Sequence, residues 1–376
     1  MSVSATASSP SKFNIIQLQR MIAAITVVAC HCTFYTSERL NNDFNIYSEG
    51  SRGVALFFVI SGFVMIISTQ RRSSKNNEWL TFILRRMARI APLYWVITTV
   101  KVVALIVAAN YVLHAELDIP YILKSYLFIP SLNLDGEIKP LLGVGWTLVY
   151  EMLFYIVFSI ALLIRRDPFI VSTLVMLSFA IASLFKTDQW PVLAYFLADG
   201  IVLDFVFGMV VAKIVISGRK ADPTVMICVL LLSLILLFAP QGGVTRFLEG
   251  VGVDTGRASL AVGILSALII WSSAGLEDRL GKFVPTPVLF LGAASYSLYL
   301  VHPMIGPIVP EVMNRLLPPS QTGAGWFAVS SATGVLASVG AAAIVYILFE
   351  KPVTGRLNEQ IKSLAGRRGK LTAHGQ

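Results

Sequence analysis

Two ionisable side chains lie in the first long apolar segment, and their spacing puts them on one side of a helix. Arg20 and His31 are eleven positions apart, and eleven steps of about 100° return to nearly the same face, about 16 Å further along. Because ionisable groups inside a membrane are costly and usually functional, His31 is the leading candidate for a general base. Alternatively, His31 only bonds a neighbouring helix, and Arg20 extends to the membrane surface.

A second candidate site is a cluster of guanidinium groups beside an aromatic pair. Arg85, Arg86 and Arg89 precede Tyr94 and Trp95 in an apolar run. Guanidinium groups at a membrane surface can bind phosphates in a fork geometry. The residues alone favour the alternative, in which the arginines anchor the cytoplasmic end of a span beside an aromatic belt.

A carboxylate opens another apolar run. Glu151 follows Trp146 and Tyr150, and Tyr155 lies one helical turn beyond it on the same face. A carboxylate near a helix start is favoured by the helix dipole. The same carboxylate could equally serve in catalysis or bind a sugar, so both interpretations stay open.

A hydroxyl-rich stripe lies late in the chain. Ser295, Tyr299 and His302 fall at positions i, i+4 and i+7, which is one helix face. Such stripes more often bond neighbouring helices than bind a substrate. In the second apolar run, Ser61 and Gly62 predict either a kink or a close contact between helices.

Metal and nucleic-acid sites are not expected. Cys30, His31 and Cys32 are adjacent, and neighbours on a helix point about 100° apart, so they cannot converge on one metal ion. The net charge of +9 comes from Lys and Arg residues concentrated in alternate loops. That distribution indicates a membrane surface and no nucleic acid.

These candidates must be positioned by membrane helices. Hydrophobic residues make up 56% of the chain and charged residues 14%, whereas a soluble domain has about 25% charged residues. We therefore predict an all-α, polytopic integral membrane bundle of about ten transmembrane helices with both termini cytoplasmic. The apolar runs cover about 14–36, 53–69, 90–113, 146–164, 168–185, 191–216, 224–239, 258–275, 288–309 and 325–349.

One membrane domain accounts for most of the chain. Residues 1–12 are rich in Ser and Ala and are predicted to be a disordered tail. Residues 13–350 form the predicted transmembrane domain. Residues 351–376 form a basic cytoplasmic tail whose helical spacing indicates an interfacial anchor.

Taken together and in order, these segments resemble the acyltransferase-three family of membrane acyltransferases. Each motif is weak alone, but the order and the placement on the spans are specific, and the resemblance runs from about residue 13 to 357. The Trp-Thr-Leu-x-Tyr-Glu form resembles the exopolysaccharide-production branch. The matching pieces are Arg20 with His31, Gly53–Phe63, Phe82–Trp95, Trp146–Tyr155, Ser295–His302 and Glu350–Pro352.

The resemblance implies an O-acetyltransferase in a bacterial inner membrane. Acetyl-coenzyme A would be the donor, and a hydroxyl of a surface polysaccharide, an exopolysaccharide or its lipid-linked precursor would be the acceptor. The residues matched to these roles fall in three groups. Catalysis is assigned to His31, Arg20 and Glu151; coenzyme A phosphates to Arg85, Arg86 and Arg89; substrate binding to Trp146, Tyr150, Tyr155, Ser295, Tyr299 and His302.

Two positions depart from the family pattern, and two other functions fit the same residues. The family usually has acidic residues where this chain has Ala55 and Met152, so roles that need those carboxylates are in doubt. A transporter or flippase for a lipid-linked glycan would also place Arg20 and His31 along a path. The same fold could use another acyl donor or acceptor.

Overall fold

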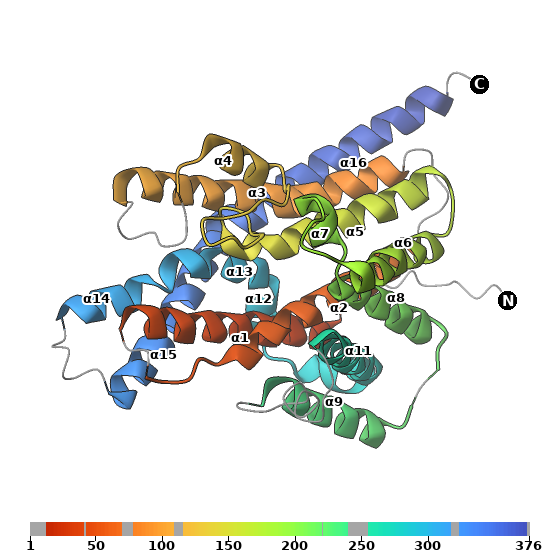
Figure 1. Ribbon diagram of the computed structural model, residues 1–376. Coiled ribbons are helices and arrows are strands. Elements are labelled where there is room, and N and C mark those ends of the chain that lie inside the picture. The colour runs from red at the N-terminus through yellow and green to blue at the C-terminus, as the bar shows by residue number, and fades with distance from the viewer. Residues whose placement is uncertain are drawn as a thin grey trace.

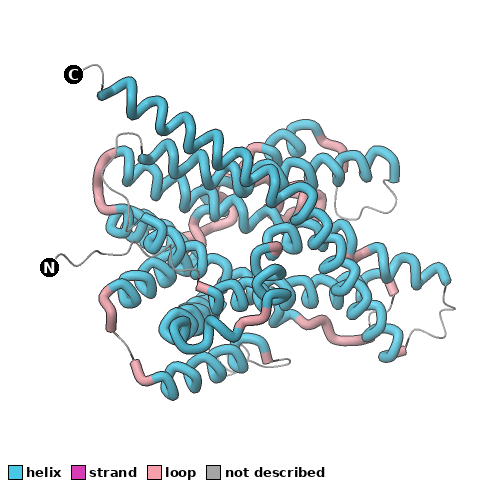
Figure 2. Tube along the Cα trace, turned by 180° about the vertical axis from the view of Figure 1, so that it is seen from behind, coloured by secondary structure: helices cyan, strands magenta, loops and turns pink. Residues whose placement is uncertain are grey.

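The described part of the chain is helical throughout. A computed structural model describes residues 13–40, 43–69, 78–108, 116–219, 221–239, 255–316 and 323–373. Within these ranges β-pairing is limited to one isolated bridge, between Leu132 and Ile138, and every regular element is a helix (Figures 1 and 2). The predicted all-α class is confirmed. The predicted tail at 1–12 lies outside the described residues.

The first and last residues of the helices agree with the predicted apolar runs in some parts of the chain and differ from them in others. The longer helices are α1 (Asn14–Arg39), α2 (Gly53–Thr69), α3 (Glu78–Ala108), α5 (Trp146–Leu163), α6 (Pro168–Ala182), α8 (Leu203–Ile216), α9 (Pro223–Phe238), α11 (Thr255–Leu280), α15 (Ala324–Val345) and α16 (Lys351–Ala373). The shorter helices are α4 (Ile119–Tyr126), α7 (Val192–Leu197), α12 (Thr286–Ala293), α13 (Ser295–Ile305) and α14 (Ile308–Leu316).

Seven helices of the described chain are long and apolar enough to cross a membrane, and a bent pair raises the number to eight. The bent pair is α12 with α13–α14, which meet at 68°. The run at 191–216 is also divided, into α7 and α8, because Gly200 and neighbouring polar residues interrupt it. The protein is therefore a multi-pass membrane protein, while ten spans and cytoplasmic termini remain predictions.

Helix α3 begins at Glu78, not near residue 90 as its apolar run predicts. Hydropathy marks only the apolar part of a helix, whereas Leu, Arg and Met are good helix formers and extend it. Arg85, Arg86 and Arg89 thus lie within the first half of α3, on a continuous helix. Pro92 lies inside the same helix without ending it.

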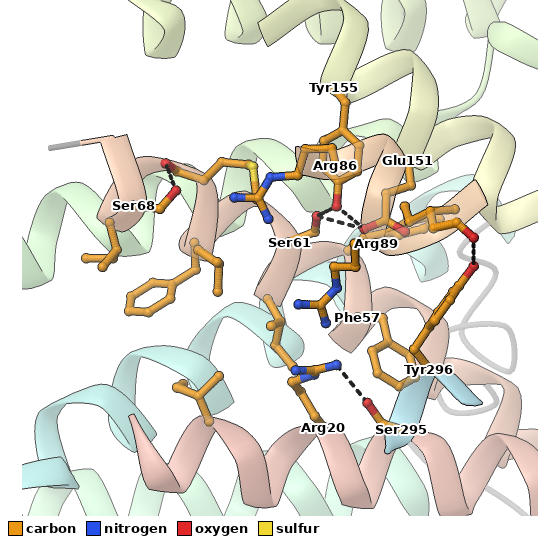
Figure 3. Close-up of a pocket in the computed structure, with 18 of the residues that line it drawn as sticks. Arg20, Phe57, Ser61, Ser68, Arg86, Arg89, Glu151, Tyr155, Ser295 and Tyr296 are labelled. Atoms are coloured by element: carbon orange, nitrogen blue, oxygen red, sulfur yellow. Dashed lines mark hydrogen bonds between the residues drawn. The ribbon is translucent and has the colours of Figure 1, made fainter. Parts of the chain in front are cut away.

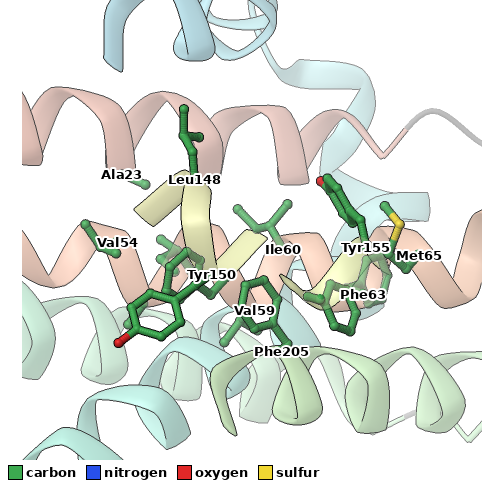
Figure 4. Close-up of a cluster of buried hydrophobic side chains, with 14 of the residues drawn as sticks. Ala23, Val54, Val59, Ile60, Phe63, Met65, Leu148, Tyr150, Tyr155 and Phe205 are labelled. Atoms are coloured by element: carbon green, nitrogen blue, oxygen red, sulfur yellow. The ribbon is translucent and has the colours of Figure 1, made fainter. Parts of the chain in front are cut away.

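The core is centred on the tight pair α2 and α8. A Cβ on Gly62 would lie 2.1 Å from the Phe205 carbonyl oxygen, and one on Gly208 would lie 2.0 Å from that of Val59. The predicted close contact at Gly62 is confirmed, and α2 runs through it unbroken. Phe205 of α8 and Val59 of α2 belong to the same buried apolar cluster (Figure 4). The Phe205 ring stacks on those of Phe58 and Phe154, with ring centroids 4.5 Å apart in each pair.

The predicted basic tail after residue 350 is the continuation of a helix. A π-helical turn at Tyr346–Glu350 joins α15 to α16. α16 then runs alongside the first half of α3 (Figure 1). The Glu350 carboxylate is buried at this turn and accepts hydrogen bonds from the backbone N–H (3.1 Å) and hydroxyl of Ser297.

Candidate active site

Two cavities lie at opposite ends of α1. We call the first the arginine cavity; it has a volume of about 850 Å³. Its lining includes Arg20, Ser61, Arg86, Arg89, Thr147, Glu151, Tyr155, Ser295, Tyr296 and Tyr299. The second, the histidine cavity, has a volume of about 890 Å³. Its lining includes His31, Lys101, Tyr121, Lys139, Val144, Trp146 and Glu311. Both volumes suit small-molecule ligands, whose sites span about 300–1,000 Å³.

The arginine cavity is lined by three guanidinium groups and one carboxylate. Arg20 comes from α1, Arg86 and Arg89 from α3, and Glu151 from α5, and these charged groups converge on the same space (Figure 3). The excess of positive charge in this lining favours an anionic ligand with several negative groups. A nitrogen of Arg20 donates to Ser295 Oγ at 2.9 Å, which fixes the guanidinium at the cavity wall.

The three sequence-predicted arginines of α3 do not share one position. The Arg86 guanidinium lies over the Phe82 ring at 5.5 Å and over the Tyr155 ring at 5.8 Å. Arg89 is three residues further and therefore lies on nearly the same face. Arg85, on the other side of Arg89 from Arg86, does not line either cavity.

The candidate carboxylate has two hydroxyl partners. Glu151 Oε1 accepts hydrogen bonds from the Tyr155 hydroxyl and from Ser61 Oγ, the latter at 3.2 Å. Ser61 Oγ also lies 3.3 Å from the Tyr155 hydroxyl (Figure 3). The i, i+4 spacing of Glu151 and Tyr155 predicted their contact, whereas Ser61 reaches the cluster from α2. This closed cluster holds the carboxylate at the cavity wall.

Two histidines from distant helices form a pair. His31 Nδ1 lies 3.0 Å from the Val27 carbonyl oxygen and 3.2 Å from His302 Nε2. His302 Nδ1 lies 3.1 Å from the Leu298 carbonyl oxygen. Carbonyl oxygens only accept, so both Nδ1 atoms carry hydrogen in the neutral pair. The single Nδ1–H of His31 is then shared between the Val27 carbonyl oxygen and His302 Nε2. The Nε2 atom of His31 keeps its lone pair.

A thin wall separates the two cavities. Tyr299 and Thr147 line the arginine cavity, and Val144, one turn before Thr147, lines the histidine cavity. The Tyr299 hydroxyl lies 3.0 Å from Thr147 Oγ1 and donates to the Val144 carbonyl oxygen at 3.1 Å. The Tyr299 ring also contacts the His302 ring, with centroids 5.9 Å apart. The wall of Val144, Thr147 and Tyr299 therefore contacts both the arginine cavity and the histidine pair.

Charged side chains around the histidine cavity are mostly paired. Glu311 forms ion pairs with Arg39 at 3.2 Å and with Arg315 at 3.0 Å, and Lys139 pairs with Glu137 at 2.8 Å. These pairs belong to the ends of α1 and α14 and to the segment after α4.

A tyrosine of α4 also lines the histidine cavity. Burial raises the pKa of Tyr121 to about 12. Its hydroxyl therefore keeps its proton and donates to the Lys139 carbonyl oxygen at 2.9 Å.

The remaining sequence-predicted residues divide into cavity and core positions. Trp146 lines the histidine cavity, whereas Tyr155, Ser295 and Tyr299 line the arginine cavity. Tyr150 is buried in the core instead: it stacks on Phe196 and donates to that residue's carbonyl oxygen at 2.5 Å. His302 is fully buried behind His31 and lines neither cavity. Arg20 and His31 share α1 but face different cavities.

Several cavity residues were missed by sequence reasoning. Thr147 is a small hydroxyl residue in an apolar run, and Ser61 is predicted only to mark a kink or a close helix contact, so neither is expected at a cavity. Lys101 did carry a signal, because it is a lone charge in the predicted span 90–113. Within the described ranges no group of three or more His, Cys, Asp or Glu side chains could hold a metal ion.

Comparison with known proteins assigns the chain to a family. The model of the acyltransferase domain (acyltransferase-three family) matches residues 13–348. The chain is 32% identical over 344 residues to the exopolysaccharide production protein ExoZ of Rhizobium meliloti (strain 1021), covering 89% of this chain and 98% of that protein. It is 28% identical over 316 residues to the acyltransferase MdmB of Streptomyces mycarofaciens, covering 76% and 77%. No solved structure matches it significantly. This chain belongs to the acyltransferase-three family and is a membrane acyltransferase.

Proposed function

We propose that this acyltransferase moves an acetyl group from acetyl-coenzyme A to a hydroxyl of a bacterial exopolysaccharide or surface polysaccharide, or of its lipid-linked precursor. The observation that carries the proposal is the pair of cavities: one lined by three arginines and one lined by His31, separated by a hydrogen-bonded wall. The similarity to a relative named for exopolysaccharide production supports the acceptor class.

The donor occupies the arginine cavity in this proposal. Coenzyme A carries several phosphate charges, and Arg86 and Arg89 can bind them as charge-assisted, forked donors. Arg20 lies deeper along α1 and guides the thioester arm toward Tyr299. The positive-inside rule supports a cytoplasmic opening for this cavity in the bacterial inner membrane, where coenzyme A is available.

The acceptor occupies the histidine cavity, where His31 acts as the general base. The lone pair on His31 Nε2 takes the proton of the acceptor hydroxyl while that oxygen bonds to the thioester carbon. The carbon–sulfur bond then breaks, and the departing thiolate receives the proton from the imidazolium. The products are an acetyl ester and free coenzyme A, and His31 returns to its neutral form.

The same nitrogen supports a two-step route. His31 Nε2 could attack the thioester first, which releases coenzyme A and leaves an acetyl-imidazole that the acceptor hydroxyl cleaves. Either route requires the thioester to reach past the Thr147–Tyr299 wall. Both routes use the tautomer that the Val27 and Leu298 carbonyl groups select.

The first experiment measures coenzyme A release by purified protein given acetyl-coenzyme A and a bacterial glycan extract. We expect acceptor-dependent release by the wild type and a loss of about 100- to 10,000-fold in His31→Ala. Ser37→Ala, on the same helix but outside both cavities, is the matched control and should retain activity. Full activity in His31→Ala at normal protein levels would remove His31 from the mechanism.

The donor site is tested in the same assay with two arginine variants of α3. Arg89→Gln should raise the KM for acetyl-coenzyme A about tenfold to a hundredfold, because a charge-assisted contact to phosphate is lost. Arg85→Gln should change it little, because Arg85 does not line the cavity. Equal effects would show that a surface arginine cluster, not the cavity, binds the donor. No release with several donors and acceptors by folded protein would favour a glycan transporter instead.

A further inference from the structure

Lys101 is a charged residue of the histidine cavity that the proposed chemistry does not use. It lies in α3, within a candidate membrane span, and its side chain lines the cavity. The other cationic side chains of this lining, Arg39, Lys139 and Arg315, each pair with a carboxylate. In the part of the chain that the structure describes, no carboxylate lies within ion-pair distance of Lys101.

An unpaired ammonium group at this depth needs an explanation. A lysine within a membrane span is costly, and such residues usually face a polar cavity and mark a substrate path. Because every other cation in the lining is neutralised by a carboxylate, Lys101 is the group available to a negative charge on the ligand. An anionic acceptor would supply the missing partner.

The surroundings of Lys101 indicate how such a ligand is shaped. The lining of the same cavity also includes apolar residues: Ala104 of α3, and Ile308 and Val312 of α14. Both α14 residues are exposed, and Val107 of α3 is 79% exposed. The polar cavity therefore has an apolar edge formed by α3 and α14.

We propose that Lys101 binds the phosphate linkage of a lipid-linked glycan, whose sugar lies in the histidine cavity and whose lipid tail leaves between α3 and α14. This inference rests on the proposed transferase function and specifies the acceptor class for the same site. It explains why Lys101 has no carboxylate partner among the described residues and why the cavity has an apolar edge. A free polysaccharide would need neither feature.

A kinetic experiment compares two acceptors that share one neutral glycan, which is either joined to a lipid by diphosphate or free at its reducing end. We expect the wild type to have the lower KM for the lipid-linked acceptor. Lys101→Gln should raise that KM about tenfold to a hundredfold and leave the KM for the free glycan and for acetyl-coenzyme A unchanged. Lys101→Arg should keep the wild-type preference, because it keeps the charge.

Lys139→Gln is the matched comparison. Its ammonium group belongs to the same cavity but is already paired with Glu137, so its loss should change the KM of both acceptors by the same factor. If Lys101→Gln also changed both acceptors equally, Lys101 would be a structural or sugar-binding residue and the assignment would be wrong. An equal preference for the two acceptors in the wild type would overturn the assignment and leave the transferase function standing.

A binding measurement separates the inference from turnover. Farnesyl diphosphate serves as a short lipid diphosphate, and farnesol serves as its uncharged counterpart. The wild type and Lys101→Arg should bind farnesyl diphosphate, and Lys101→Gln should bind it at least tenfold more weakly. If Lys101→Gln bound it as tightly as the wild type, the phosphate site would lie elsewhere. Specific binding without any transferase activity would instead count against the proposed function alone.

Discussion

At the scale of single residues, hydrogen-bond acceptors select which histidine nitrogen is reactive. The Val27 and Leu298 carbonyl groups require a hydrogen on each Nδ1 atom, and His302 Nε2 accepts from His31. His302 is therefore a positioning residue: it lines no cavity, but it holds the ring and the tautomer of His31. In this tautomer His31 Nε2 carries no hydrogen.

This role predicts different outcomes for two variants of His302. His302→Leu removes one of the two acceptors of the His31 Nδ1–H, since the Val27 carbonyl oxygen remains, and should lower kcat about tenfold to a hundredfold, with the KM for acetyl-coenzyme A unchanged. His302→Gln offers an amide oxygen in its place and should recover most of the lost kcat. Steady-state kinetics of both variants check this. Equal loss in the two variants would indicate that His302 only fills space.

Sequence reasoning found the residues whose polarity contrasts with an apolar run. Arg20, His31 and Glu151 were marked because each is an ionisable group where none is expected. The partnership of His31 with His302 could not be predicted, because the two residues meet only when α1 and α13 pack together. The packing of Tyr150 against Phe196 could not be predicted for the same reason, since sequence spacing gives the face of a helix but not the helix it faces.

At the scale of elements, the packing of α2 against α8 depends on two missing side chains. Gly62→Ala and Gly208→Ala should each lower the melting temperature in detergent, because a Cβ at either position would overlap a carbonyl oxygen of the facing helix. Overpacking of this kind costs about 1–3 kcal/mol. Thermal unfolding measures the shift.

The matched control for this prediction is Gly340→Ala in α15. A Cβ at Gly340 meets nothing within 4 Å, and alanine favours a helix over glycine by about 1 kcal/mol. Its melting temperature should therefore stay the same or rise slightly. If Gly62→Ala and Gly208→Ala kept the wild-type melting temperature, α2 and α8 would be able to move apart and admit a Cβ without a loss of stability.

The boundaries of elements show where hydropathy is informative. The predicted runs at 53–69 and 146–164 match α2 and α5 within a residue, because each is an uninterrupted apolar helix. The run at 288–309 is broken near residue 294, and the bend of 68° there could not be read from composition. A bend is set by packing against neighbouring helices, which the apolar pattern does not report.

At the scale of the whole molecule, the two cavities at opposite ends of α1 predict two separate routes of access. In a Cys228→Ser background, Ser68→Cys lines the arginine cavity and Asp135→Cys lines the histidine cavity. Cys30 and Cys32 are buried and can be retained. A membrane-impermeant thiol reagent should label Ser68→Cys only in inverted membrane vesicles and Asp135→Cys only in right-side-out vesicles. Labelling of both from one side would contradict opposite openings.

The hydrogen-bonded wall of Val144, Thr147 and Tyr299 has a consequence for the membrane potential. Two water-filled cavities that met end to end would form a pore, and each proton that crossed would dissipate about 2.3 kcal/mol per 100 mV of membrane potential. In the proposed reaction the acetyl group would pass from one cavity to the other beside Thr147 and Tyr299, and the hydrogen bonds of Tyr299 would keep the two cavities from joining into a path for ions.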